Sequence, residues 1–536
     1  MLRHRRCETI MLVAAAILQQ WIVADAGADT APVVNDDRAK PLKLVLTRPS
    51  YRNTIFASLP VAKIKVEAYP SMHINPGLIV DSTLQLQVLD AQGKVFASRT
   101  RTNEGLRFLI RTEVDVSQLP PGDFRLEARL IDSAGNLIKS VSGIECVDSL
   151  PLHKLKPAPH EVAFDGRGIC HVDGEPFFPI GIFHIWPNIF NYMNSLRAES
   201  QLEPLTWEGW YQKLKDAGFN SFQDWQGGRE PDELRARYDV AERLGFRGQV
   251  HPNSDRDIET LAGHGGVLGW YTMDEPMLQP NTTTQKLADM YEHLKTLDPH
   301  HPQFICDNQP SSLSTIAPYV DAIMHDLYPQ RDGDMRIVGR ATLHARKLKN
   351  GRAPVWPVIQ AFQLSRYAKK ADGSTYSFGR LTEDEMRVTV FDSIACGATG
   401  IYYYAYYTSE GPQDLPGGGT RKDYMVEDFP DQWNAMTRIN HELARIVPAI
   451  LSGRTIGTSV EPAESDVHAA TFMDGGRAIV VVANPTRTHL CVRIGVPGIG
   501  DEGRDLFSAK TVAGRRGWLN VHLEALGAHA FVLEMP

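Results

Sequence analysis

The chain has 536 residues, of which 43% are hydrophobic and 22% are charged. These values are ordinary for globular proteins, and a chain of this length is expected to form about two to four domains rather than stay disordered. The formal net charge is −8, with 56 Lys and Arg against 64 Asp and Glu. No basic footprint for nucleic acid is present, so no nucleic-acid partner is expected.

The first 26 residues have the layout of a secretory signal peptide. Basic residues at Arg3–Arg6 precede the apolar run Ile10–Leu18, and Ala24-Asp25-Ala26 supplies a small-residue cleavage site. An uncleaved membrane anchor is the alternative, but the apolar run is shorter than the roughly 20 residues that a span needs. We therefore expect an exported protein, secreted or periplasmic, with no stable membrane insertion after cleavage.

Five cysteines remain beyond the predicted cleavage site, and none forms a Cys-x-x-Cys motif. This spacing predicts neither a zinc ribbon nor a redox pair. Cys146 and Cys170 flank a predicted domain junction and are candidates for a disulfide. An odd number of widely spread cysteines favours free buried thiols instead. The sequence carries no signal for the oligomeric state.

Short β-strand patterns flank the central part of the chain. Residues 27–41 are rich in Ala, Asp and Pro and are expected to form a flexible leader. Residues 42–148 contain alternating apolar runs separated by Gly, Asp and Asn turns, which is typical of a β-sandwich. Residues 149–160 are proline-rich and are expected to be a linker. Short strands return at residues 453–536 and predict a small C-terminal β-sandwich domain.

Residues 161–452 alternate between strand-like and helical segments. Eight apolar runs predict strands: Pro179–His184, Phe219–Trp225, Phe246–His251, Val267–Glu275, Pro302–Asn308, Val320–Tyr328, Pro354–Phe362 and Ala398–Tyr407. Helical patterns cover Thr206–Ala217, Pro231–Leu244, Thr283–Leu297, Met335–Leu348, Thr382–Cys396 and Gln432–Ile450. This order and length indicate a (β/α)8 TIM barrel. A doubly wound open sheet is the alternative, but its usual Gly-rich first turn is absent.

Catalytic residues of such a barrel lie at the carboxyl ends of its strands. The predicted strand ends are rich in carboxylates and aromatic rings, and they lack a P-loop and an HExxH helix. Aromatic faces that stack on sugar rings around central carboxylates suit a carbohydrate substrate. The residues expected to line a sugar pocket are His184, Asp224, Trp225, His251, Trp270, Tyr271, Asn308, Tyr328, Gln360 and Tyr404. No ligand spacing is diagnostic of a metal, so neither a metal nor a cofactor is expected.

The segment Gly269-Trp-Tyr-Thr-Met-Asp-Glu-Pro276 ends the fourth predicted strand. A carboxyl group beside aromatic walls and a second carboxylate has a raised pKa. Such a group can protonate a leaving glycosidic oxygen near neutral pH, so Glu275 is expected to be the general acid and Asp274 to tune or orient it. In the structural alternative, Asp274 caps the next turn and Glu275 pairs with an arginine.

Three segments resemble secreted glycoside hydrolases with a clan-A-like barrel: Val172–Ile182, Gly269–Pro276 and Gly397–Tyr404. The resemblance spans residues 161–410. It implies a TIM barrel with accessory β domains, hydrolysis of O-glycosidic bonds, and Glu275 as the acid/base at strand four. The chain departs from the family twice, because Asp274 stands where an asparagine is usual and Gln360 stands where the strand-seven glutamate nucleophile is expected.

An amide cannot form a glycosyl-enzyme ester, so three mechanisms stay open. The nucleophile or base comes from another strand, with Asp326 favoured; or the reaction is inverting, with Asp224 or Asp326 activating water. In the third mechanism the substrate's own acetamido group attacks while Asp274 orients it, an arrangement that resembles hexosaminidases. Glu385 is not expected to replace the missing glutamate, because Thr382–Glu385 reads as a helix capping box.

Two further classes of function remain as alternatives. A non-catalytic carbohydrate-binding protein on a degenerate hydrolase barrel is consistent with the missing strand-seven glutamate. A polysaccharide lyase acting on uronates would need a base, which His251 or Tyr328 could supply, and a positive charge at the substrate carboxylate.

Overall fold

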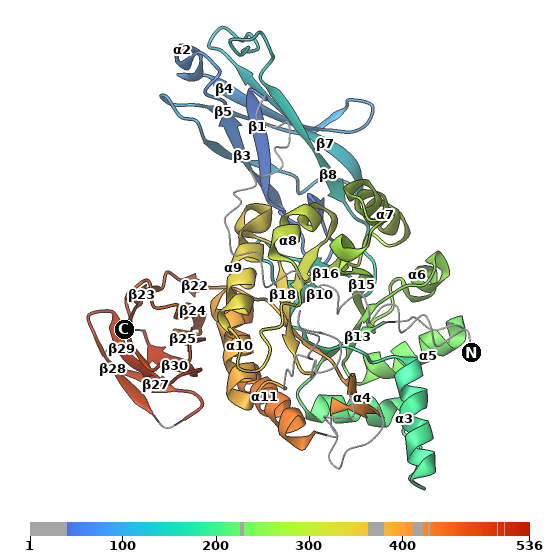
Figure 1. Cartoon of the computed structure of the whole chain (residues 1–536). Helices are drawn as coiled ribbons and strands as arrows, with labels where there is room; N and C mark the ends of the chain where they lie inside the picture. Colours follow the sequence, from blue (N-terminus) through green and yellow to red (C-terminus); the bar gives the residue numbers. More distant parts are fainter. Residues whose placement is uncertain are drawn as a thin grey trace. The chain divides into compact units, whose positions relative to one another are not determined.

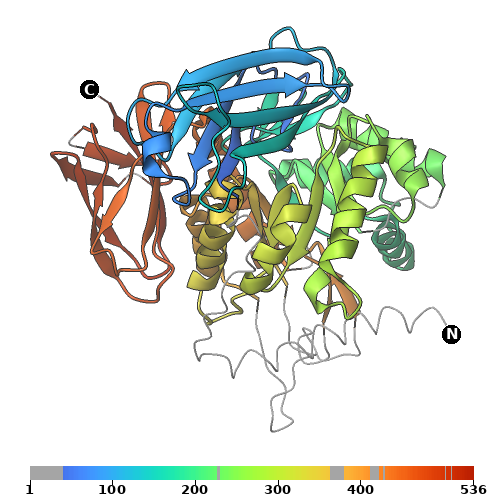
Figure 2. The same cartoon turned by 90° about the horizontal axis from the view of Figure 1, so that it is seen from above.

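The computed structural model describes residues 40–225, 230–362, 380–410, 422–426, 429–500, 502–508 and 510–535. Two compact units are present: one extends to Gly166 and includes His171–Glu175, and the other comprises Arg167–Cys170 and Pro176 onward (Figures 1 and 2). The predicted signal peptide and almost all of the predicted leader lie outside the described residues, so export stays a prediction. Within the described ranges, no helix is long and apolar enough to cross a membrane.

The first unit contains the predicted β-sandwich. Its elements are β1 (Leu42–Arg48), β2 (Thr54–Ile55), β3 (Lys63–Pro70), α2 (Pro76–Ile79), β4 (Thr83–Leu89), β5 (Val95–Thr102), β6 (Ile110–Asp115), β7 (Gly122–Ile131) and β8 (Val147–Lys154). A sheet of order β1-β3-β6 and a sheet of order β2-β8-β7-β4-β5 share one apolar core. Alternation supplies this core, since Val66, Leu86 and Leu126 are buried while their strand neighbours are more exposed. The predicted linker therefore begins inside a strand, because Leu152 of β8 joins the core.

A small sheet of order β11-β10-β9 follows the sandwich in the chain. Its strands are β9 (Val162–Phe164), β10 (Cys170–Val172) and β11 (Glu175–Phe177).

The second unit contains a closed barrel of eight parallel strands, which confirms the predicted fold class. Its strands are β12 (Ile180–Ile182), β13 (Ser221–Asp224), β14 (Arg247–Val250), β15 (Val267–Asp274), β16 (Gln303–Asp307), β17 (Ala322–His325), β18 (Val355–Gln360) and β19 (Ile401–Tyr404). Each lies within one of the eight predicted runs. The helical elements are α3 (Pro187–Glu199), α4 (Trp207–Asp216), α5 (Pro231–Arg243), α6 (Asp255–Leu261), η2 (Pro276–Leu278), α7 (Thr284–Leu297), α8 (Pro310–Ile316), η3 (Ala317–Tyr319), α9 (Arg336–Gly351), α10 (Glu383–Ala395) and α11 (Pro430–Ser452).

Alternate residues of each barrel strand face the helices or the barrel interior. On β13, Phe222 packs on the rings of Tyr211 and Tyr238, which belong to the surrounding helices. Its neighbour Ser221 instead forms a 2.6 Å hydroxyl hydrogen bond with Tyr402 of β19 inside the barrel. This alternation decides which strand-end side chains reach the site.

A buried ion pair joins β13 to α5. The Arg237 guanidinium donates to Asp224 Oδ2 over 2.5 Å, and the Tyr238 hydroxyl donates to the same oxygen over 3.2 Å. Both charged side chains are almost fully buried. Taking away one partner of such a pair leaves the other charge buried without its counter-charge.

We expect Arg237→Met to lower the free energy of unfolding by about 3–5 kcal/mol, because it removes the ion pair and the 2.5 Å hydrogen bond that Arg237 gives to the buried Asp224 carboxylate. Urea denaturation at pH 7 measures the change. The double variant Asp224→Leu/Arg237→Met is the control, and it should recover most of the loss. Equal destabilisation of the single and double variants would contradict a role for the ion pair.

The C-terminal strands form one sheet in the order β22-β24-β25-β30-β27-β28-β29-β26-β23. They are β22 (Thr455–Ile456), β23 (Ser459–Glu461), β24 (His468–Asp474), β25 (Arg477–Ala483), β26 (Leu490–Gly495), β27 (Glu502–Asp505), β28 (Thr511–Arg515), β29 (Trp518–Leu523) and β30 (Ala528–Glu534). A short antiparallel pair, β20 (Tyr407–Glu410) with β21 (Lys422–Met425), precedes α11. Strands β24 and β25 pack against α10 within the same compact unit as the barrel (Figure 1).

The predicted capping box opens α10. Glu385 N donates to Thr382 Oγ1, and Thr382 N donates to Glu385 Oε2 over 2.8 Å. Glu385 is thus a structural residue at the helix start, as predicted.

None of the five described cysteines forms a disulfide. Four of them, Cys146, Cys170, Cys306 and Cys396, are buried as expected. The expectation is wrong for Cys491, which is exposed because it has the outward-facing parity of β26.

Candidate active site

The carboxyl ends of the barrel strands bring together most of the predicted site residues. Three carboxyl groups occupy the centre: Asp274 is the last residue of β15, Glu275 follows it directly, and Asp326 follows β17. Asp274 and Asp326 each raise the pKa of a neighbouring carboxyl group through their charges, so the three groups form one electrostatic cluster.

Glu275 is fixed by its backbone and by one amide. Its backbone lies in the left-handed region, with φ 42° and ψ 56°. Such a conformation is costly for a residue with a side chain and is commonly found where function requires it. The backbone N–H donates to Cys306 O over 2.8 Å, and Asn308 Nδ2 donates to Glu275 Oε1 over 2.6 Å. The carboxyl is therefore held next to β16.

The electrostatic surroundings of Glu275 favour its protonated form. Burial raises the pKa of Glu275, and the negative charges of Asp326, Asp274 and Asp307 raise it further, while the Asn308 hydrogen bond acts in the opposite direction. No described lysine or arginine forms an ion pair with Asp274, Glu275 or Asp326. A carboxyl in these surroundings retains its proton at neutral pH.

Asp274 is held by its own strand. The Tyr271 hydroxyl donates to Asp274 Oδ1 over 2.5 Å, and Gln279 Nε2 donates to the Asp274 carbonyl over 2.8 Å. Burial raises the pKa of Asp274, the Tyr271 hydrogen bond lowers it, and the charge of Asp307 raises it. The net effect is a raised pKa of Asp274.

Among the three carboxyl groups of the cluster, Asp326 has the fewest side-chain hydrogen bonds to described residues. It is only 9% exposed, and its Oδ1 is buried without a hydrogen-bond partner among the described residues. Burial and the charges of Asp274 and Asp307 raise the pKa of Asp326, while the Cys306 thiol acts in the opposite direction. A buried carboxylate oxygen with no partner is costly, and such atoms concentrate at sites that bind something else.

A connected set of aromatic and imidazole rings adjoins the carboxyl cluster through Tyr404 and Tyr328, whose pKa values the charges of the cluster raise. Trp225 stacks on His251, with centroids 5.6 Å apart and planes at 10°. Trp225 and His184 form a T-shaped pair with centroids 6.4 Å apart and planes at 81°. His184 also contacts Tyr404 at 4.8 Å, and Tyr404 contacts Tyr328 at 6.1 Å. These five rings are half-buried, so each presents part of its surface.

Both imidazoles are neutral at neutral pH. Burial lowers the pKa of His184 to about 4, and burial also lowers the pKa of His251. His184 Nδ1 donates to Tyr407 O over 3.2 Å, and His251 Nδ1 donates to Tyr271 O over 2.8 Å. In each ring the remaining nitrogen, Nε2, is then a hydrogen-bond acceptor.

Two predicted pocket residues do not reach this site. Trp270 is completely buried, and its indole N–H donates to Asp298 Oδ2 over 3.0 Å at the end of α7. Asp224 is engaged by Arg237 of α5. Both have the strand parity that faces the helices, so neither is available to a sugar in this structure.

Gln360 lies at the end of β18, but its amide is already used. Its Oε1 accepts from Gln330 N over 3.0 Å, and its Nε2 donates to Gln330 Oε1 and to Phe362 O. The residue at the strand-seven position therefore organises the neighbouring loop.

Three residues outside the predicted set belong to the site region. Cys306 lies close enough to Asp326 and Asp274 for their charges to add to burial in raising the pKa of its thiol. Phe362 forms T-shaped pairs with Tyr328 and Tyr404, and Trp186 stacks on His184. Cys306 stands two positions before Asn308, so the two side chains point to the same face of β16. This two-residue spacing could have identified Cys306 from the sequence.

Two groups of side chains elsewhere have ligand atoms within 4.8 Å of one another: Asp392, Cys396 and His468, and Asp239, Glu242 and His264. In each, the histidine is hydrogen-bonded to an aspartate, over 2.6 Å in the first and 2.9 Å in the second. Neither group includes a residue of the carboxyl cluster.

No protein-family model matches the sequence, and a comparison with curated proteins gives no match. Similar solved structures include an FMN-binding β-glucuronidase from Facaelibacterium prausnitzii L2-6, with 12% identity and a TM-score of 0.37 over 93% of this chain and 71% of that one. An Anoxybacillus α-amylase has 11% identity and a TM-score of 0.42 over 67% of this chain and 98% of that one. A β-D-glucuronidase of Dictyoglomus thermophilum has 14% identity and a TM-score of 0.35 over 74% and 68%. Likeness at this level does not bear on the activity of this chain.

Proposed function

We propose that the protein hydrolyses glycosidic bonds of an oligo- or polysaccharide, with Glu275 as the general acid and Asp326 as the second carboxylate. The observation that carries this proposal is the buried carboxyl cluster. In it the charges of Asp326 and Asp274 keep Glu275 protonated, and half-buried aromatic and imidazole rings lie next to it. Glycoside hydrolysis needs one protonated and one ionised carboxyl group, and Asp326 would supply the ionised one at pH values above its raised pKa.

Glu275 would protonate the leaving glycosidic oxygen. The Asn308 amide occupies Oε1 over 2.6 Å, so the proton is directed to Oε2. Proton donation is most effective when the acid stays protonated at the working pH, and the charges around Glu275 produce that state. After bond cleavage the ionised Glu275 would take a proton from the water that completes the reaction.

Asp326 is favoured as the second carboxylate because its competitors are engaged. Asp307 accepts from Ser312 Oγ over 2.5 Å and from Gln309 N over 3.0 Å. Asp224 is paired with Arg237, and Asp274 accepts from Tyr271. Asp326 Oδ1, which lacks a partner among the described residues, would act as the nucleophile or as the base that activates water.

The surrounding rings would bind the sugar. Trp225 and Tyr404 offer half-buried aromatic surfaces against which the apolar face of a pyranose ring can pack. His184 and His251, neutral through their lowered pKa, would accept hydrogen bonds from sugar hydroxyls at Nε2. Neutral acceptors beside a protonated Glu275 add no positive charge that would stabilise its ionised form.

A substrate panel tests this function. Purified protein and its Glu275→Gln variant are incubated with neutral, amino and acidic polysaccharides and with aryl glycosides, and both reducing ends and ultraviolet absorbance are recorded. We expect new reducing ends with wild type and a collapse of this signal in the variant. Unsaturated, ultraviolet-absorbing products would identify a lyase instead, and binding without cleavage across the panel would identify a carbohydrate-binding protein.

The pH dependence of hydrolysis follows from the shared charge of the cluster. The pKa values of Asp326 and Glu275 are both raised, so the acid limb, where Asp326 ionises, and the alkaline limb, where Glu275 loses its proton, both lie above those of unperturbed carboxyl groups. We expect Asp274→Asn to move both limbs to lower pH, because it removes a negative charge that raises both pKa values. Profiles of kcat/KM measure the shift; unmoved limbs would contradict the coupling.

A further inference from the structure

The loop from Asp326 to Met335, here called the β17–α9 loop, carries Asp326 and Tyr328 at its start. Its middle is tightly folded: Gln330 and Asp332 have left-handed backbones, with φ 60° and 63°. At Gly333 a Cβ atom would lie 1.9 Å from Pro329 O, so only glycine fits there. Left-handed non-glycine residues persist where surrounding contacts impose them.

The first half of the loop is held from inside the barrel. Gln330 N and its side-chain Oε1 both bond to the amide of Gln360, over 3.0 and 3.1 Å. This contact reaches the loop four residues after Asp326.

The second half is held by Glu385 of α10 and by Arg487 of the C-terminal domain. Glu385 Oε1 accepts from Asp332 N over 2.9 Å and from Arg487 over 2.5 Å. The same guanidinium donates to Gly333 O over 3.3 Å. Glu385 is 1% exposed, so the loop backbone, a buried carboxylate and a domain-crossing arginine form one network.

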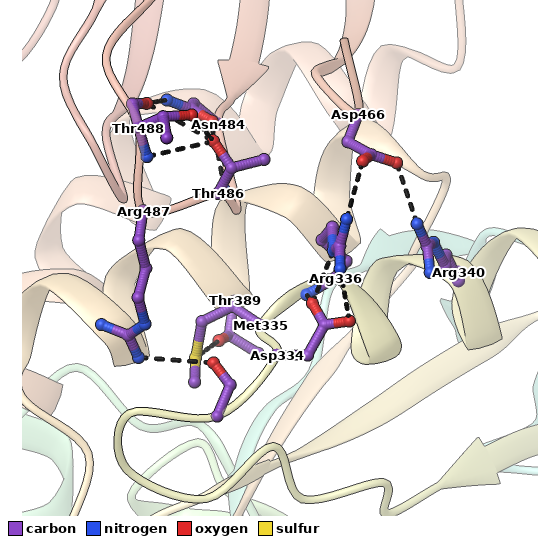
Figure 3. Close-up of polar contacts among 11 residues, drawn as sticks. Asp334, Met335, Arg336, Arg340, Thr389, Asp466, Asn484, Thr486, Arg487 and Thr488 are labelled. Carbon is purple, nitrogen blue, oxygen red and sulfur yellow. Dashed lines mark hydrogen bonds and ion pairs between the residues drawn. The ribbon is translucent and has the colours of Figure 1, made fainter. Parts of the chain in front are cut away.

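Arg487 is presented to this network by a structured turn after β25, which Figure 3 shows. Asn484 Oδ1 accepts from Thr486 N and Thr486 Oγ1, and Asn484 Nδ2 donates to Thr488 O over 2.8 Å. Asn484 is completely buried, which fixes the base of the turn. The hydrogen bonds of this turn fix the backbone at Arg487, so its side chain extends toward Glu385.

A second link between the domains meets the end of the loop. Arg336 binds Asp334 through Nε over 2.6 Å and Asp466 of the C-terminal domain through a terminal nitrogen over 2.9 Å (Figure 3). Arg340 also donates to Asp466, over 2.9 Å, and Thr389 Oγ1 contacts Met335 Sδ at 3.7 Å. Each of residues 332–335 is thus held by a contact, from Glu385, Arg487, Arg336 and Thr389 respectively.

We propose that Arg487 is a positioning residue for the active site: through Glu385 and Gly333 it holds the β17–α9 loop so that Asp326 and Tyr328 keep their places. The C-terminal β domain is then part of the frame of the catalytic centre. The inference rests on the proposed function for its catalytic consequence, while the bracing itself is independent of any activity.

The test compares Arg487→Ala with a matched control, Arg438→Ala, in the full chain. Arg438 is also an exposed arginine bound to the first turn of α10, where its Nε donates to Glu383 Oε1 over 2.6 Å, but it has no hydrogen bond or ion pair with the β17–α9 loop among the described residues. Hydrogen exchange of the loop amides is read first. We expect exchange at Asp332–Asp334 to rise about tenfold in Arg487→Ala and to stay at the wild-type rate in Arg438→Ala.

The second measurement is the steady-state kinetics of Arg487→Ala on a substrate that the wild-type protein hydrolyses. In Arg487→Ala we expect kcat to fall about tenfold with little change in KM, because a displaced catalytic group slows chemistry more than binding. The alkaline limb of the profile should move to lower pH as the Asp326 charge moves away from Glu275. Arg487→Lys should restore part of kcat, since it supplies the charge but not the two-site geometry.

The outcomes separate the two proposals. Unchanged loop exchange in Arg487→Ala overturns the bracing whatever the activity of the protein. Faster exchange with unaltered kcat and pH profile overturns the positioning role. Faster exchange in a protein with no hydrolytic activity at all supports the bracing and removes the proposed function.

Discussion

Glu275→Gln is expected to lower kcat/KM on unactivated glycosides by about 10²–10⁴-fold, the usual contribution of a positioned general acid. Glutamine keeps the shape of the side chain and its contact with Asn308 Nδ2, but it has no proton to give. Aryl glycosides with good leaving groups need little protonation, so their hydrolysis should fall much less. The dependence of the rate on leaving-group pKa measures this difference.

The same variant should be at least as stable as wild type. The folded-state pKa of Glu275 is raised, so the stability linked to this group is full below its unfolded pKa and declines as pH rises toward the folded value. At pH 8 glutamine removes that penalty, and the midpoint of thermal unfolding should hold or increase. A large drop in this midpoint would mean that lost activity reflects misfolding and not lost acid catalysis.

Asp326→Asn is expected to cost about 10²–10⁴-fold in kcat, because the amide neither attacks the anomeric carbon nor activates water. If Asp326 is the nucleophile or base, azide should restore turnover of an activated aryl glycoside by Asp326→Ala. Asp307→Asn is the control for the charge alone, because it also removes a negative charge that acts on the cluster while Asp307 itself is held by Ser312 Oγ over 2.5 Å. Equal losses in the Asp326 and Asp307 variants would contradict a chemical role for Asp326.

Asp274→Asn separates the remaining mechanism. If Asp326 variants stay active while Asp274→Asn is inactive on 2-acetamido sugars alone, the substrate's acetamido group is the nucleophile and Asp274 orients it. The 2.5 Å contact from Tyr271 would then hold Asp274 for that task.

The barrel could be predicted from the sequence because its strands are buried on both faces and leave continuous apolar runs between amphipathic helices. Val355–Gln360 is buried along its whole length, and every predicted strand contains an observed one. The β8 strand was missed because Pro151 within it resembles a linker signal.

The site could be predicted only in part, because a strand end places a residue near the mouth without fixing the direction of its side chain. Strand parity separates Trp225, which meets the imidazoles, from Asp224, which pairs with a helix arginine. It likewise separates Tyr271 from Trp270. The role of Arg487 depends on a contact between residues far apart in sequence and has no local signal.

The most direct measurement is proton NMR of a polysaccharide digest, recorded in parallel for wild type and Glu275→Gln on the substrate that the panel identifies. We expect new reducing-end anomeric signals to grow with wild type and to be absent or severely slowed with the variant, without vinylic signals in either. Equal growth of anomeric signals in both digests, or vinylic products with wild type, would contradict Glu275 as the acid of a glycoside hydrolase.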